Sequence, residues 1–198
     1  MAVMDNDKPR YTAEEFYKMI PETNLKVELI DGEIVSDYPL DELMRGSTET
    51  LLAGTSAAHQ KIVGRLFSRF DSFIMKNGGS CQTFVSPYDI ELDEYNTVQP
   101  DVLIICDPSK VSEKKGLGAP DLVVEVVSSN RSDDYNRKLA LYKKFGVREY
   151  WIVDPFKELT IVYRFGEPID ISFYAFDKPI PVGIWEGRCE IVIAEMLG

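Results

Sequence analysis

The chain has 198 residues, with 33 acidic and 22 basic side chains and a formal net charge of −11. This length suits one domain with a real core, and a hydrophobic fraction of 44% is typical of a soluble globular protein. The charge balance argues against a protein that coats nucleic acid, because affinity for DNA comes from basic groups that neutralise phosphates. No apolar run reaches the roughly 18 residues that a membrane-spanning helix needs.

The first part of the chain carries two local signals. Residues 1–10 are polar and have no apolar stretch, so we expect a mobile segment and not a signal peptide. Residues 12–15 (TAEE) match a capping box, which predicts a short helix directly after it. Residues 26–33 alternate around an Asp-Gly pair, which predicts a β-hairpin. Residues 36–56 show no clean period, and a lid, a dimer contact or an embellished loop all remain open.

A longer helix is predicted over residues 56–76, where apolar side chains recur at helical spacing. Its first turn contains His59, the only histidine of the chain. A single histidine is more often structural, and no serine or cysteine triad can be assembled without one. A place for His59 beside a functional site stays open.

The centre of the chain predicts an α/β arrangement. Residues 82–92, 98–106 and 122–128 have the apolar character of three core strands, with a polar loop between the last two. A helix over residues 132–145 then leads to an apolar strand at 149–153, and such a crossover places the last strand parallel to a neighbour. Further short apolar segments predict a β-rich C-terminal extension, and residues 191–197 have a helical pattern. We find no repeats or linkers, so the expected organisation is a single domain over 1–198.

The three cysteines are scattered along the chain at Cys81, Cys106 and Cys189. The first two lie next to or within apolar runs, so reduced, buried thiols are expected, which fits a cytoplasmic protein. The sequence has no CxxC pair, and a structural zinc site is therefore not expected.

Acidic side chains occupy two of the predicted strands. Asp101 opens one apolar run, Asp121 opens the next, and Glu125 lies in the middle of the latter among four valines. A carboxylate in such a setting is costly to bury unless a cation, a proton or hydrogen bonds compensate it. Alternatively, Asp101 and Asp121, which each follow a proline, bond only to loop backbone. That alternative is strong for Asp121 and weaker for Glu125, which has no turn beside it.

Neighbouring strands would bring the carboxylates of Asp101 and Glu125 together. At about 4 Å and an effective dielectric constant of about 20, two such charges repel by about 4 kcal/mol, so a proton or a cation is required. Oxygen ligands favour a hard cation, Mg²⁺ first, with Mn²⁺ or Ca²⁺ as alternatives. Lys138, on the helix that follows, either forms an (i, i+4) pair with Asp134 or directs its ammonium group toward these carboxylates.

Several motifs, individually weak and jointly specific, resemble one family. They are YTAEEFYKMIP, VELIDGEIV, AAHQKIVGRLFSRF, VQPDVLII, APDLVVEVVS, RKLALYKKFGVREYWIVDP and AEML, which follow one another over nearly the whole chain. The chain resembles the putative restriction endonuclease family, formerly a domain of unknown function, of the PD-(D/E)XK nuclease superfamily. The resemblance implies an α/β fold with a restriction-endonuclease-like α-β-β-β-α-β core and a mixed sheet, plus the N-terminal hairpin and the C-terminal β-rich extension.

The resemblance also implies a set of site residues. Asp101 matches the second-strand acid and Glu125 the third-strand acid, and both would be metal ligands. The position two after Glu125, where the superfamily has its lysine, is a valine here, and Lys138 matches a lysine that has moved to the helix. Glu28, in the hairpin, matches an accessory acid, although without the family it reads as an exposed hairpin acid with Lys26 as its same-face neighbour. His59 and Asp121 are further accessory candidates.

The implied function is a Mg²⁺-dependent endonuclease, with Mn²⁺ as an alternative metal, that hydrolyses phosphodiester bonds in DNA. A local basic patch would then have to offset the acids, and its candidates are Lys61, Arg65, Arg69, Lys110, Lys114, Lys115, Arg131, Arg137, Lys143 and Lys144. Two alternatives stay open. One is a non-catalytic relative that acts as a homodimeric scaffold, favoured by the charge of −11 and the missing in-strand lysine. The other is a metal-dependent phosphohydrolase of small nucleotides.

Overall fold

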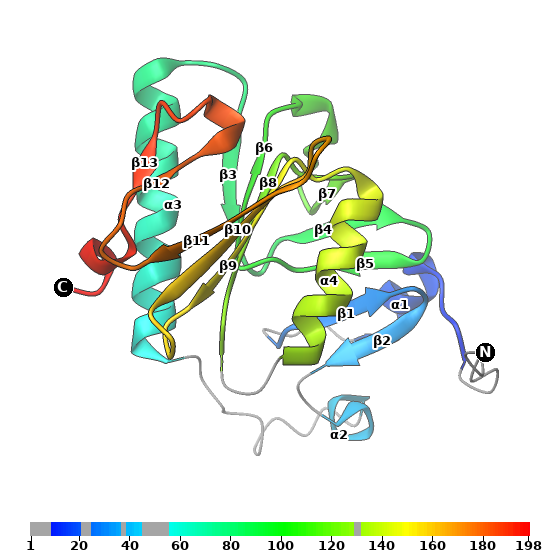
Figure 1. Ribbon diagram of the computed structural model, residues 1–198. Helices are drawn as coiled ribbons and strands as arrows, with labels where there is room; N and C mark the ends of the chain where they lie inside the picture. Colours follow the sequence, from blue (N-terminus) through cyan, green and yellow to red (C-terminus); the bar gives the residue numbers. More distant parts are fainter. Residues whose placement is uncertain (1–8, 21–24, 37–38, 45–55, 129–131) are drawn as a thin grey trace.

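The computed structural model describes residues 9–20, 25–36, 39–44, 56–128 and 132–198, and the chain folds around two β-sheets (Figure 1). The larger sheet has six strands in the order β11-β10-β9-β8-β6-β3. Among the described strands of this sheet only the β8–β9 pair is parallel, as predicted for the helical crossover. Its strands are β3 (Gln82–Val85), β6 (Val102–Ile105), β8 (Leu122–Val126), β9 (Glu149–Asp154), β10 (Leu159–Arg164) and β11 (Asp170–Ala175).

The smaller sheet has five strands in the order β2-β1-β5-β4-β7. The predicted hairpin forms its edge, and positive φ angles at Asp31 (50°) and Gly32 (78°) make the two-residue turn. The strands of this sheet are β1 (Val27–Ile30), β2 (Glu33–Ser36), β4 (Asp89–Asp93), β5 (Asn96–Val98) and β7 (Lys115–Leu117). A third, two-stranded sheet joins β12 (Ile180–Pro181) and β13 (Glu190–Ile191).

The two long helices cover opposite faces of the larger sheet (Figure 1). α3 (Ala57–Asn77) packs Ile62, Leu66 and Phe70 against the side chains of Val102, Ile104 and Val124 and their same-face neighbours. α4 (Ser132–Phe145) packs Leu141 and Tyr142 against the alternate side chains, Leu103, Val123 and Tyr150. Helix α3, strands β3, β6 and β8, helix α4 and strand β9 therefore form the expected α-β-β-β-α-β core.

Short helical elements complete the structure. The predicted capping box is present at α1 (Ala13–Met19), where Thr12 and Glu15 bond reciprocally. In the region of 36–56, the structure describes α2 (Leu40–Met44), and residues 37–38 and 45–55 lie outside the described part. Residues 1–8, for which we expected mobility, also lie outside it. The 3-10 helices are η1 (Pro108–Lys110), η2 (Gly183–Trp185) and η3 (Ile193–Met196), the last in place of the predicted C-terminal helix.

Two predicted strands are wrong in their extent, for the same reason. Residues 82–92 divide into β3 and β4, and residues 98–106 divide into β5 and β6, so each segment passes from one sheet into the other. A proline lies at each crossing, Pro87 and Pro100, and proline cannot donate to a strand ladder. The crossings are adjacent, because the Ser86 N–H donates to the Asp101 carbonyl at 3.3 Å.

Two further expectations are corrected. The loop over residues 107–118 contains strand β7, which pairs in parallel with β4. Cys81 and Cys106 form a disulfide and are not reduced thiols, because they flank the ends of the antiparallel β3–β6 pair and so face each other. Cys189 is free and buried. The described residues contain no helix that is long and apolar enough to cross a membrane.

Candidate active site

The two acids singled out in the sequence lie opposite each other. In the antiparallel β6–β8 pair, Val102 faces Val124, and one further step along this register sets Asp101 against Glu125. The Val126 N–H donates to Oδ2 of Asp101 at 2.8 Å, which fixes that carboxylate against the partner strand. Both acids are almost fully buried, at 7% and 3% exposure. The expectation that Asp101 and Glu125 meet is therefore met by the geometry.

An ammonium group lies between these two carboxylates. Nζ of Lys26 is 3.2 Å from Oδ1 of Asp101 and 2.9 Å from Oε2 of Glu125. Lys26 directly precedes β1 in the smaller sheet. The sequence analysis noted Lys26 only as a same-face neighbour of Glu28. Because the two side chains point to the same side of the strand, this spacing was the signal that could have placed Lys26 in the site.

Helix α4 supplies a second ammonium group. Nζ of Lys138 lies 2.9 Å from Oε1 of Glu125 and 2.8 Å from Oε2 of Glu28, and the side chain is 1% exposed. The expectation that this lysine points to the carboxylates agrees with these contacts, whereas the side chain of Asp134 lies outside the described part. One turn later Tyr142 donates its hydroxyl to Oε1 of Glu125 at 3.1 Å. Sequence reasoning missed Tyr142, although residues four apart share a helix face.

Glu28 lies behind the pair of acids. It comes from β1, and its Oε1 accepts the Gln99 N–H at 2.8 Å as well as a bond from Lys138 at 2.9 Å. Its remaining oxygen also faces Lys138. Glu28 thus bonds Lys138 and the Gln99 N–H, at the point where the chain passes from one sheet to the other. These contacts suit a supporting acid better than a metal ligand.

His59 comes from α3, which covers the face of the larger sheet opposite to α4. Ser56 caps α3 by accepting the His59 N–H at 3.2 Å, which fixes the first turn. Nε2 of His59 then lies 3.3 Å from Oδ2 of Asp101, and the ring is buried. In the described part of the chain, Nδ1 has no hydrogen-bond partner. The histidine therefore orients the carboxylate of Asp101.

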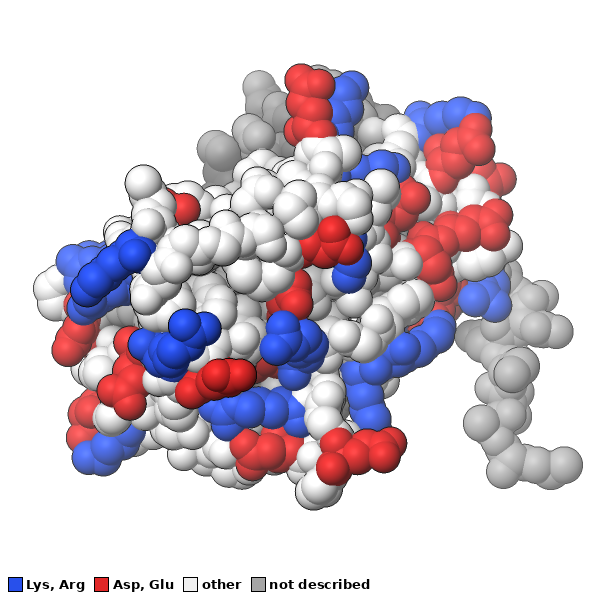
Figure 2. Space-filling view, turned by 90° about the horizontal axis from the view of Figure 1, so that it is seen from above, with Lys and Arg blue, Asp and Glu red and all other residues white. Residues whose placement is uncertain are grey.

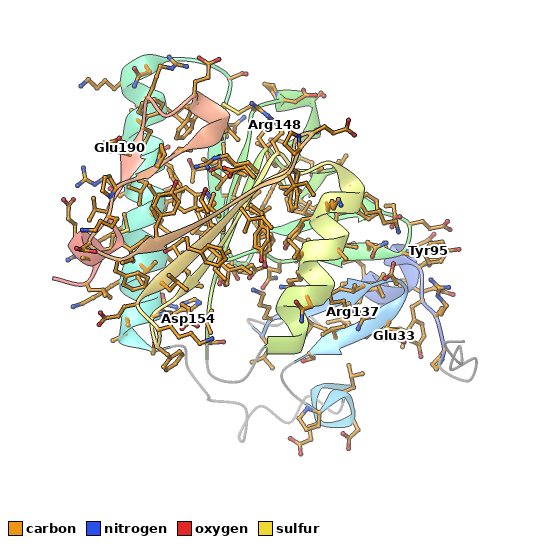
Figure 3. All side chains as sticks on the ribbon, viewed as in Figure 1. Glu33, Tyr95, Arg137, Arg148, Asp154 and Glu190 are labelled. Atoms are coloured by element: carbon orange, nitrogen blue, oxygen red, sulfur yellow. A yellow bond between two sulfur atoms is a disulfide. The ribbon has the colours of Figure 1, made fainter. Side chains whose placement is uncertain are left out.

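Asp121 makes its hydrogen bonds outside this cluster. Its Oδ2 accepts the Cys106 N–H at 2.8 Å, and its Oδ1 pairs with Arg148 at 3.1 Å. The bond to the Cys106 N–H is the backbone contact that the sequence offered as an alternative for an acid after a proline. Figure 3 shows Arg148 at the upper end of the molecule, away from the lower end of α4 where Arg137 is labelled.

The environment shifts the pKa values of these groups in opposite directions. Burial raises the pKa of Asp101, but the charge of Lys26 and the bond to His59 outweigh it, and the pKa lies well below its usual range. Burial keeps the pKa of Glu125 above its ordinary value despite the opposing charges of Lys138 and Lys26. Burial lowers the pKa of Lys26, yet Asp101 and Glu125 raise it further, so the ammonium form is favoured. The cluster is therefore a set of mutually dependent charges.

Each metal-ligand candidate presents one oxygen atom. Oδ2 of Asp101 and Oε1 of Glu125 are each bonded by two other protein groups. Oδ1 of Asp101 and Oε2 of Glu125 are bonded, among the described residues, only by Lys26. The described residues contain no group of three or more His, Cys, Asp or Glu arranged as a complete metal site. Mg²⁺ is commonly held by one or two carboxylates, with water and substrate phosphate as the other ligands. The residues present therefore fit such an ion at the position of the Lys26 ammonium group.

Comparison with known proteins agrees with this architecture. The family model described as Uma2, putative restriction endonuclease, matches residues 13–179. The chain therefore belongs to this family. The crystal structure of a putative nuclease of the DUF820 family from Anabaena variabilis superposes with a TM-score of 0.71 at 19% identity, covering 94% of this chain and 97% of that one. At this identity the likeness shows the fold alone. No curated protein matches the chain.

Proposed function

We propose that this chain is a divalent-metal-dependent endonuclease that hydrolyses phosphodiester bonds in DNA. The observation that carries the proposal is the convergence of Asp101 Oδ1 and Glu125 Oε2 on a single cation. Membership in the family supports a nuclease, and the paired carboxylates support Mg²⁺, with Mn²⁺ as the alternative. When bound there, the ion would activate a water molecule and screen the scissile phosphate.

The protein residues have distinct roles in this proposal. Asp101 and Glu125 would hold the ion through their presented oxygens, while His59 and the Val126 N–H keep Asp101 in position. Lys138, which bonds Glu125, would stabilise the negative charge that develops on the reacting phosphate. Glu28 fixes Lys138 in turn.

Binding of DNA needs positively charged side chains, but many of the candidate basic residues already bond other groups of the protein. Lys61 and Arg65 donate to the C-terminal backbone, and Arg69 pairs with Glu195. On the face of the molecule in Figure 2, Lys and Arg lie interspersed with Asp and Glu and form no single basic patch. We therefore propose that contacts at the reacting phosphate, and not an extended basic groove, hold the substrate.

Cleavage of supercoiled plasmid DNA tests this function. We expect nicking or linearisation by the wild-type protein that depends on added Mg²⁺ or Mn²⁺ and stops with EDTA. Asp101→Ala should lower the rate by about two orders of magnitude or more, because it removes one of the two carboxylates that would hold the ion. Product is followed by agarose gel electrophoresis over time.

Asp121→Asn is the matched control, because it alters an acid of the neighbouring strand that bonds outside the cluster. We expect this variant to cleave at close to the wild-type rate. Circular dichroism checks that each variant is folded. Equal cleavage by wild type and Asp101→Ala, or no cleavage by wild type with either metal, would contradict the proposal.

A second candidate is a non-catalytic relative. In this case the chain would be a single domain that forms a homodimeric scaffold in the cytoplasm. It is favoured by β11, which ends the larger sheet and exposes the apolar side chains of Ile171 (50%) and Phe173 (65%). Saturable Mn²⁺ binding that is lost in Glu125→Ala separates the candidates, because a scaffold has no need of a retained metal site.

A further inference from the structure

We propose that Lys26 is an internal cation that occupies the metal position and is displaced when the divalent ion binds, while Lys138 stays in place. This inference rests on the proposed metal-dependent function. It assigns to Lys26 the role of a cation that competes with the metal ion, which neither the resemblance nor the sequence pattern indicated.

The first argument is the identity of the atoms that Lys26 contacts. Its Nζ bonds to Oδ1 of Asp101 at 3.2 Å and to Oε2 of Glu125 at 2.9 Å. The opposite oxygens of both carboxylates are bonded by other donors, namely His59, Val126, Lys138 and Tyr142. The ammonium group therefore uses the same two oxygens that a metal ion would need, and the two cations exclude each other.

The second argument is the difference between the two lysines. The side chain of Lys26 is 16% exposed and lies at the start of a strand, whereas that of Lys138 is 1% exposed in the packed face of α4. Lys138 is also held by Glu28, which bonds it through both carboxylate oxygens. In the described part of the chain, the acids that Lys26 bonds are Asp101 and Glu125, the two proposed metal ligands, and no further acid outside this pair bonds it. Lys26 is therefore the lysine that can swing out toward water.

The third argument is charge. The carboxylates of Glu28, Asp101 and Glu125 with the ammonium groups of Lys26 and Lys138 leave one net negative charge in a buried cluster. Adding a divalent ion with Lys26 in place would make the cluster positive, whereas exchanging the ion for Lys26 makes it neutral. Buried charge is tolerated only when it is balanced, so exchange is favoured over addition.

Metal affinity tests the inference directly. Lys26→Met keeps the length of the side chain and removes its charge, so the ion no longer has a competitor. We expect Mn²⁺ to bind Lys26→Met at least about tenfold more tightly than wild type, measured by isothermal titration calorimetry, since like charges at such separations repel strongly. In EDTA the same variant should unfold at a lower temperature than wild type, because Asp101 and Glu125 then lack their counter-ion.

Two variants separate competition from other effects. Lys26→Arg keeps the positive charge, so its Mn²⁺ affinity should be no tighter than that of wild type. Lys144→Met removes a lysine that pairs with Asp31 on the hairpin at 3.7 Å, outside the cluster, and should leave the affinity unchanged. An affinity of Lys26→Met equal to or weaker than that of wild type overturns the inference.

The outcome also distinguishes this inference from the proposed function. Tighter Mn²⁺ binding by Lys26→Met together with no DNA cleavage by wild type sustains the exchange and refutes the nuclease. Metal-dependent cleavage by wild type together with unchanged affinity in Lys26→Met refutes the exchange and sustains the nuclease. Absence of Mn²⁺ binding in both proteins overturns both.

Discussion

Glu125 accepts bonds on both of its oxygens, from Lys138 and Tyr142 on one and from Lys26 on the other. A carboxylate in the middle of an apolar strand is stable only because this full set of donors surrounds it. Tyr142 is the neutral donor of the set, and the negative charge of Glu125 adds to burial in raising the pKa of its hydroxyl.

Tyr142→Phe removes this hydroxyl and leaves the ring in the core. We expect the free energy of unfolding to fall by about 1–2 kcal/mol, since a hydrogen bond to a charged acceptor is lost. Urea denaturation followed by circular dichroism measures it. The exposed Tyr95 provides a control, because Tyr95→Phe should change the free energy by less than about 0.5 kcal/mol. A Tyr142→Phe value as small as that of the control would show that the hydroxyl contributes nothing.

The two acids that share Lys26 could be found from the sequence because an apolar strand is an unusual place for a carboxylate. Asp101, Glu125 and Lys138 were placed from strand alternation and from the family resemblance, and the structure brings all three together. Lys26 and Tyr142 could not be chosen in this way. A lysine before a hairpin and a tyrosine in an apolar stripe have plain local explanations, and only the contact between the two sheets makes them part of the site.

At the scale of the elements, α3 carries its site residue in its first turn. The N-cap Ser56 fixes this turn by accepting the His59 N–H, and His59 in turn bonds Asp101. The stability of the helix end and the position of Asp101 are therefore linked through His59 and these two hydrogen bonds.

Ser56→Ala tests this link. We expect a loss of about 1 kcal/mol in the free energy of unfolding, since the cap of the first turn is removed, together with weaker Mn²⁺ binding. Ser56→Asp, which keeps a capping oxygen, should restore the stability. A loss of stability without any change in metal affinity would show that His59 does not depend on its cap.

Alternation and capping signals predicted the hairpin, both long helices and the crossover to β9, because these features follow from short-range pattern. The division of two predicted strands between the sheets was not predictable in the same way. Pro87 and Pro100 marked the interruptions, but only tertiary packing decides whether a strand resumes in the same sheet. The Cys81–Cys106 disulfide was missed for a related reason, since it depends on the β3–β6 register.

At the scale of the whole molecule, the net charge of −11 limits how DNA can be bound. Several basic side chains are engaged with acids, such as Lys115 with Glu91 and Arg137 with Glu33, the latter pair shown where α4 meets β2 in Figure 3. Few cations in the described part are then available for phosphates.

We therefore predict a shallow salt dependence of DNA binding. With about three or fewer phosphates neutralised, the slope of log K against log salt concentration should not exceed about 3 in magnitude. Fluorescence anisotropy of a labelled duplex with the Asp101→Ala variant in EDTA, between about 50 and 200 mM salt, measures it. A slope of about 6 or steeper would reveal a basic groove that the described residues do not contain.

The cluster also fastens the smaller sheet onto the larger one, because Lys26 and Glu28 come from the β1 end and their partners from β6, β8 and α4. If the ion replaces Lys26, the contacts of Lys26 with Asp101 and Glu125 are lost, while the contact of Glu28 with Lys138 remains. A ligand usually stiffens the body that receives it. Here, the exchange would remove the link that Lys26 makes between the two sheets, while the pairs of Lys138 with Glu28 and of Arg137 with Glu33 would still hold the hairpin to α4.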